Sequence, residues 1–147
     1  MFGVFMKNEE IILRQYEKYI DSAEKVSDRR QTANNFFLSL NSILLTFTGF
    51  LTTFSFEFWH TILAFAGVCI SILWFLTITS FRNLNSGKFK VIYAIEKRLP
   101  LRLFDEEWRH LGRGNKIQKY IKISLVEQGI PIIFFFLYLL VIILMII

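Results

Sequence analysis

Two long apolar stretches, separated by one short polar step, constrain the fold of this chain more than any other feature. They cover residues 35–56 and 58–81, and across both stretches only Glu57 and His60 readily carry charge. Each stretch is long enough to cross a hydrocarbon core of about 30 Å as a helix. The pattern therefore predicts a membrane hairpin, with an outer turn between a first and a second span.

A third apolar block, residues 128–147, contains no charged residue and predicts a third span. The chain has 147 residues, of which 54% are hydrophobic. Three spans leave too few residues for a separate catalytic domain. We expect an all-α membrane protein forming one membrane unit. Its predicted parts are a cytoplasmic amphipathic helix over 8–33, the three spans, and a short, basic, helical cytoplasmic segment over 82–127.

The placement of Lys and Arg predicts the orientation. Residues 82–127 carry 11 Lys and Arg against 5 acidic residues, residues 1–33 carry 6 of each sign, and the turn around 53–60 has no Lys or Arg. Basic residues near a span stay on the cytoplasmic side. We therefore expect the N-terminus and residues 82–127 inside, and the turn and the C-terminus outside. No secretory signal pattern opens the chain, so the first span is expected to act as the insertion signal.

Apolar residues recur at helical spacing before the first span, and they predict a helix that packs against another helix. They are Ile12, Tyr16, Tyr19, Ile20, Ala23 and Val26. No Pro or Gly interrupts residues 8–48, so this helix is expected to continue into the first span. After the second span we expect a turn-rich exit over 82–87, a short helix over 88–99 stopped by Pro100, a brief helix closed by Gly112 and Gly114, and a helix over 116–126 leading into the last span.

The first span carries polar residues in repeats of seven. One line contains Asn34, Asn41 and Thr48, a second Asn35, Ser42 and Gly49, and a third Ser39, Thr46 and Thr53. Polar side chains at membrane depth have to face protein or water. They either join helices of neighbouring copies, for which the seven-residue period is typical, or line a water-filled path, or do both. The stripe therefore predicts self-assembly.

The outer turn offers two interpretations. Glu57 and His60 could form a polar ring at the outer mouth of an oligomer, which would favour cations. The alternative is an ordinary solvated turn beside an aromatic anchor, Trp59.

Other chemistry finds little support. Cys69 is the only cysteine, so an intrachain disulfide is impossible, and a buried structural thiol is expected. Glu106 and His110 have the spacing of two metal ligands on one helical face, but no third ligand accompanies them. No phosphate-binding loop or catalytic triad motif occurs. We therefore expect no enzyme activity, cofactor or metal. The basic charges of 82–127 are single rather than clustered, so nucleic acid is not an expected partner, while membrane lipid is.

Several runs of the sequence form a recognisable pattern. They extend from Tyr19 to Asn41, from Arg82 to Ile92 and from Glu96 to Pro100, with shorter motifs at Glu107-Trp108, Leu111-Gly112-x-Gly114 and Glu127-x-x-x-Pro131. Together they resemble the RipA family of small octameric bacterial membrane proteins. A looser similarity is to small membrane-pore proteins that accompany some RNA-targeting CRISPR systems. The family resemblance implies a ring of about eight copies in the bacterial inner membrane.

These observations leave two functions open. The first is a ring-like, pore-like assembly with a cytoplasmic helical ring for self-association or partner binding. The second is a non-conducting membrane scaffold that organises lipid or recruits a cytoplasmic protein partner.

Overall fold

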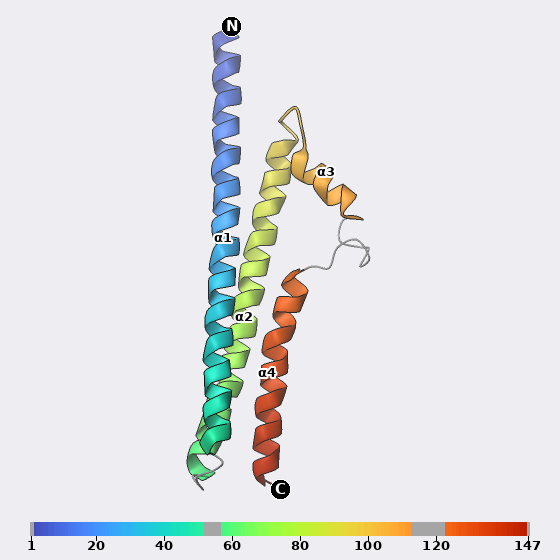
Figure 1. Ribbon diagram of the computed structural model, residues 1–147. Coiled ribbons are helices and arrows are strands. Elements are labelled where there is room, and N and C mark those ends of the chain that lie inside the picture. Colours follow the sequence, from blue (N-terminus) through green and yellow to red (C-terminus); the bar gives the residue numbers. More distant parts are fainter. Residues whose placement is uncertain (1, 52–56, 113–122, 147) are drawn as a thin grey trace. The chain divides into compact units, whose positions relative to one another are not determined.

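The computed structural model of this chain is all-helical in the part that it describes, which is residues 2–51, 57–112 and 123–146. Four helices follow one another there: α1 (Phe2–Leu51), α2 (Glu57–Glu96), α3 (Leu103–His110) and α4 (Ile123–Ile146). Two of them are much longer than a membrane crossing needs (Figure 1). The all-α class predicted from the sequence is confirmed for the described residues.

Helix α1 runs without a break from the predicted cytoplasmic helix into the predicted first span. No Pro interrupts it, so every peptide group after the first turn can donate to the preceding turn. On its exposed side Arg14 pairs with Glu10, one turn earlier, at 2.7 Å. The expected continuation of this helix through residues 8–48 is confirmed.

The turn-rich exit predicted at residues 82–87 is wrong, because α2 continues through it to Glu96. Asn, Ser and Gly each disfavour a helix interior by at most about 1 kcal/mol. Contacts with α1 offset this cost. The Asn85 amide donates to the Ser27 hydroxyl at 3.4 Å, and the Lys88 ammonium donates to Ser22 at 2.7 Å. Lys88 also lies 5.1 Å from the centre of the Tyr19 ring.

Helix α2 ends where Pro100 requires, and α3 follows after a short link. The amides of Arg98 and Leu99 bond to carbonyls three residues earlier, which tightens the last turn of α2. Helix α3 ends before Gly112, whose φ of 69° is the left-handed conformation that closes many helices. The closing role predicted for Gly112 is therefore confirmed. Gly114 and most of the predicted helix 116–126 lie outside the described residues.

Two helices in the described part are long and apolar enough to cross a membrane, the first within Phe58–Glu96 and the second over Leu125–Met145. Only 28% and 11% of their apolar windows are buried, so neither is covered as the core helix of a soluble protein would be. The described residues of the predicted first span are not among these candidates. Their Asn, Ser and Thr residues lower the hydropathy, and the first span stays a prediction.

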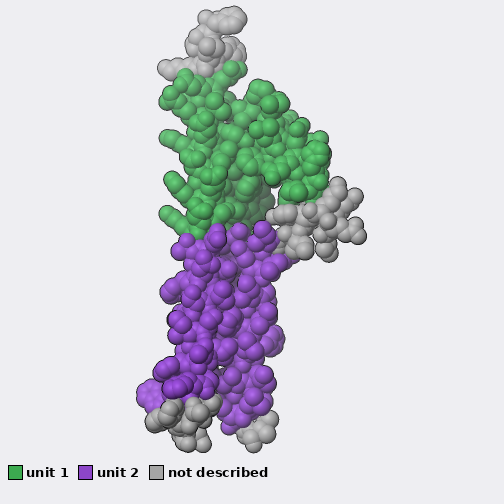
Figure 2. Space-filling view, viewed as in Figure 1, with its two compact units in different colours: residues 1–29, 81–122 green, residues 30–80, 123–147 purple. Residues whose placement is uncertain are grey.

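The chain divides into two compact units, shown in different colours in Figure 2. Unit 1 contains residues 1–29 and 81–122, and unit 2 contains residues 30–80 and 123–147. Both long helices contribute to both units, so this division does not test the prediction of a single membrane unit. The borders between the two units along the chain fall within a few residues of the ends predicted for the spans on the side of residues 82–127.

Candidate functional site

The polar residues of the predicted first span divide into a covered and an uncovered set. Asn41 and Thr48 are fully buried in unit 2, and Asn34 is half-buried. We call these three residues the buried polar line. The other five polar or small positions are exposed in the single chain, and we call them the α1 polar face: Asn35, Ser39, Ser42, Thr46 and Gly49.

Asn41 joins three helices of its own chain. Its amide nitrogen donates to the Phe37 carbonyl at 2.9 Å, and its backbone carbonyl accepts from the Tyr138 hydroxyl of α4 at 3.0 Å. The hydroxyl of Ser71, on α2, lies 3.3 Å from the Asn41 side-chain oxygen and 2.8 Å from the Gly67 carbonyl. One proton serves one acceptor at a time, so Ser71 shares its bond between the two. Asn41 is thus satisfied inside the protomer.

A buried indole contacts the N-terminal end of the buried polar line. The Trp74 ring nitrogen on α2 donates to the Asn34 side chain at 3.0 Å. The ring stacks on Phe37 at 6.1 Å between centroids and meets Phe134 of α4 at 5.8 Å. Aromatic rings in such arrangements contribute beyond the area that they bury. Trp74 therefore contacts both α1 and α4 from α2 within unit 2.

Gly67 and an ion pair complete the packing of α4 against the other helices of unit 2. A Cβ atom at Gly67 would overlap the Tyr138 ring, so only glycine allows this approach. Near the start of α4, Gln128 donates to the Thr79 hydroxyl at 2.8 Å. Arg30 and Glu127 form a mostly buried ion pair at 3.3 Å, whose Nε–H geometry falls short of a hydrogen bond.

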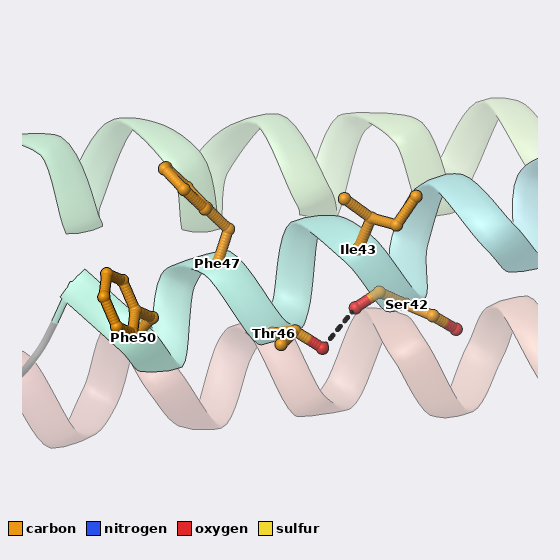
Figure 3. A pocket seen from close by; sticks show the side chains of 5 residues that line it. All are labelled: Ser42, Ile43, Thr46, Phe47 and Phe50. Carbon is orange, nitrogen blue, oxygen red and sulfur yellow. Dashed lines mark hydrogen bonds between the residues drawn. The ribbon is translucent and has the colours of Figure 1, made fainter.

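The α1 polar face borders an open groove on the surface of unit 2. The groove is lined by Ser42, Ile43, Thr46, Phe47 and Phe50, and its volume is about 410 Å³. Figure 3 shows these side chains projecting from successive turns of α1. Its wall is mostly apolar, with two hydroxyl-bearing residues on one side. An open apolar groove beside small residues suits the side chains of another helix better than a water-filled passage.

The hydroxyl of Thr46 already has a partner in its own helix. It donates to the Ser42 carbonyl at 2.8 Å, the dashed line in Figure 3. Thr48 makes the equivalent bond to Leu44 at 2.7 Å. Hydroxyls bonded in this way can stand in an apolar environment without water. The hydroxyls of Thr46 and Thr48 therefore support a water-filled path less strongly than the sequence alone suggests.

The predicted outer-mouth residues are only partly described. Helix α2 begins at Glu57, but its side chain lies outside the described part, as does Thr53. His60 lies in the first turn of α2 and is only 5% exposed. It is thus a buried helical residue and does not belong to an open, solvated turn. The role of these residues at an outer mouth stays a prediction.

In unit 1, a buried carboxylate connects three helices. Glu96, the last residue of α2, is fully buried. It accepts hydrogen bonds from the Tyr16 hydroxyl of α1 at 2.9 Å, from the Phe104 amide at 2.9 Å and from the Asp105 amide at 3.2 Å. Arg102, the residue just before α3, does not cap that helix with its side chain. Glu96 therefore caps the N-terminus of α3 from another helix, where the helix dipole favours negative charge.

The apolar face predicted for the cytoplasmic helix surrounds this carboxylate. Tyr16 and Ala23 form a buried cluster with Ile92 of α2, and Tyr19 and Ile20 pack against it. Ile12 is half-buried. Burial raises the pKa of Tyr16 from 10.0 to about 12, and the hydrogen bond to Glu96 and the negative charge of Glu96 contribute to the same shift. These side chains contact α2 of their own chain.

The described residues contain no group of three or more His, Cys, Asp or Glu that could hold a metal ion. Glu106 and His110 are both exposed on α3. Cys69 is exposed on α2, so the expected buried thiol is wrong. Its side of the second span is one that no other described helix covers.

Sequence reasoning missed four residues that organise the two units: Gly67, Trp74, Glu96 and Tyr138. Three of them resemble ordinary members of an apolar span. Glu96 resembles any charged residue at the end of a surface helix. A usable signal was the lack of a capping side chain before Asp105, since an uncapped helix end needs a partner from elsewhere.

The sequence model of a protein family described as the octameric membrane protein family (8xMP) matches residues 13–147, which is nearly the whole chain. No curated protein and no solved structure gives a significant match.

Proposed function

The chain belongs to the octameric membrane protein family, and from this premise we propose that eight copies form a ring in the membrane whose subunits meet along the α1 polar face. The observation that carries the proposal is the division of the polar stripe. Asn41 and Thr48 are buried within the protomer, whereas the neighbouring lines, one through Ser42 and one through Thr46, are exposed.

The proposal includes the first span as a third membrane crossing. Within unit 2, residues of α1 bond or stack with Ser71 and Trp74 of α2 and with Tyr138 of α4. The latter two helices are apolar enough to cross a membrane. A segment in contact with both has to lie at the same depth, and its own hydropathy matters less because the two neighbours cover its most polar line.

Small residues along the α1 polar face support close packing with a helix of the next copy. Nothing lies within 4 Å of a Cβ atom at Gly49. Membrane helices associate through small residues that let backbones approach, since lipid provides no hydrophobic drive. Phe47 and Phe50 border the groove and would then pack against the helix of the next copy. Contact between copies also gives Ser42 and Asn35 polar partners, which lipid does not provide.

We place the ring in a bacterial cytoplasmic membrane, with unit 1 inside. The excess of Lys and Arg in residues 82–127 and its absence from the turn support this orientation. In this arrangement the exposed surface of unit 1 is available for self-association in a cytoplasmic ring. It is also available to a cytoplasmic protein partner, as a scaffold requires. No catalytic role forms part of the proposal.

A double substitution tests the contact. Ser42→Leu with Thr46→Leu fills the small-residue face, and we expect loss of the octamer in native mass spectrometry from mild detergent. Cys69→Leu is the matched control, because it adds similar volume at an exposed position of α2. An octamer that persists in the double variant, or that Cys69→Leu disrupts equally, would contradict the assignment.

Conduction through the ring is the second candidate, supported by the exposed amide of Asn35 and hydroxyls of Ser39 and Ser42. Planar-bilayer recordings of the purified octamer test it. Ser39→Val reduces the polarity of the face without a large change in volume. If a conductance exists and this variant leaves it unchanged in an intact octamer, the α1 polar face does not line the path.

A further inference from the structure

Unit 1 carries two exposed faces of opposite charge on its two long helices. On α1, acidic residues recur at spacings of seven, four, three and four, which place them on one side of the helix. They are Glu10, Glu17, Asp21, Glu24 and Asp28, all exposed. Arg14 and Lys25 lie on the same side, each four residues after an acidic residue, and Arg14 pairs with Glu10. We call the row of acidic residues the acidic face of α1.

The exposed side of α2 in unit 1 is basic, apolar and free of carboxylates. Glu96 is the only acidic residue from Arg82 to Pro100, and it is buried. The exposed side, which we call the basic face of α2, includes Leu84, Gly87, Lys90, Val91 and Ala94, together with the polar Asn83 and Ser86 and with Lys97 just past the end of α2. Nothing lies within 4 Å of a Cβ atom at Gly87, and Leu84 is 51% exposed. This face could receive a helix at close range.

Asp21 and Lys90, one from each face, are not paired with each other within one chain. Neither Asp21 nor Lys90 forms a hydrogen bond or an ion pair with another described residue. A ring of identical subunits uses two different surfaces of each copy, one for each neighbour. Opposite charges on the same protomer fit that requirement, because each interface then brings an acidic row to a basic one.

The register of the two helices sharpens the match. Three hydrogen bonds between α1 and α2 pair residue 27 with 85, 22 with 88 and 16 with 96. The two numbers in each pair add up to between 110 and 112. Asp21 is therefore level with Lys90, and Glu17 lies about one turn from the level of Lys97. Rotation about an axis parallel to the helices keeps every residue at its own height, so Asp21 of one copy meets the height of Lys90 in the next.

We propose that in the octamer the acidic face of α1 in one copy docks on the basic face of α2 in the adjacent copy, with Asp21 opposite Lys90. The inference rests on the proposed ring, and it names the second contact of each interface, outside the membrane. The row of Gly87 and Ala94 lets the neighbouring α1 approach, and the lysines on its edge pair with the carboxylates. Because both faces are solvated in the free protomer, added salt should weaken this contact.

Cysteine cross-linking of the full-length protein tests the pairing. In a Cys69→Ser background, Asp21→Cys with Lys90→Cys should give a ladder of disulfide-linked species up to the octamer on a non-reducing gel. A bond within one chain cannot produce a ladder. Ser22→Cys with Lys90→Cys is the matched control, since Ser22 is next to Asp21 in height but lies about 100° round α1, where it bonds Lys88 of its own chain. It should give no ladder.

Charge exchange provides the second measurement. Asp21→Lys and Lys90→Asp, each alone, should lose the octamer at low ionic strength, and the two together should restore it. Lys90→Asp alone could lose the octamer while Asp21→Lys neither loses it nor restores it in the double variant. The basic face would then contact something else, such as anionic lipid, and the inference is overturned.

The native mass of the unaltered chain separates the two proposals. A chain that is not octameric refutes the ring itself, whereas an intact octamer with no ladder for the 21–90 pair, or an equal ladder for the 22–90 pair, refutes only this interface.

Discussion

Replacing Glu96 by Gln tests whether one buried carboxylate holds α3 in place. The carboxylate accepts from two backbone amides of α3 and from Tyr16. Hydrogen bonds to a charged group are worth about 1.5–3 kcal/mol each. The amide of Gln preserves the shape, but its nitrogen cannot accept a hydrogen bond. At least one donor is therefore left buried without a partner, and the remaining bonds lose their charge.

We expect the free energy of opening α3 to fall by about 2–4 kcal/mol in Glu96→Gln. Every 1.4 kcal/mol is a factor of ten, so amide hydrogen exchange in Leu103–His110 should accelerate by about 30- to 1,000-fold. Hydrogen-exchange mass spectrometry of the full-length protein in nanodiscs measures this. The matched control is Glu107→Gln, an exposed carboxylate of the same helix, for which we expect a change below about 0.5 kcal/mol.

An unchanged exchange rate at Phe104 and Asp105 in Glu96→Gln would refute the capping role. Equal acceleration in Glu107→Gln would also refute it, because the effect would then follow from the general charge of α3 and not from the buried contact. Exchange in α4 serves as an internal reference, since none of its described residues contacts Glu96.

Three further outcomes follow from the geometry of the two units. The neutral Tyr16 hydroxyl is favoured in the folded protein, so its contribution is complete below pH 10 and is lost as the pH rises toward about 12; Tyr16→Phe should remove this alkaline step from a fluorescence or exchange titration. Gly67→Ala should destabilise the α2–α4 packing by about 1–3 kcal/mol in an SDS unfolding titration, whereas Gly129→Ala, where a Cβ meets nothing, should not; equal effects would contradict the overlap with Tyr138. Asn41→Leu should destabilise the protomer by about 1–2 kcal/mol in the same titration, and an unchanged midpoint would show that its buried bonds are idle.

Local patterns determined much of this fold before any contact was known. The length and apolarity of residues 58–81 and 128–147 predict helices that are apolar enough to cross a membrane, where only backbones that satisfy their own hydrogen bonds are accepted. The helical spacing of Tyr16 and Ala23 indicated which side of α1 packs. Pro100 and Gly112 marked the ends of helices because their backbone limits act on their own residue and its neighbours. These features depend on a few adjacent residues.

The break expected at residues 82–87 shows where such reasoning fails. Asn, Ser and Gly disfavour a helix only weakly, and the bonds of Asn85 and Lys88 to α1 come from about 60 residues away in the chain. Propensity is a small local term, and tertiary contacts of similar size override it. Glu96 is a second case, since burial of its charge depends on donors from α1 and α3 together.

The polar stripe of the first span marks the division most clearly. Asn41 and Ser42 are adjacent, both are polar, and both belong to seven-residue repeats, so the sequence by itself determines that this helix needs partners on more than one side. Only the tertiary structure decides which partners. Trp74, Ser71 and Tyr138 converge on the line through Asn41 and satisfy it within the protomer, while no described helix covers the line through Ser42. Periodicity specifies the faces of a helix, but the neighbours that cover each face come from distant parts of the chain.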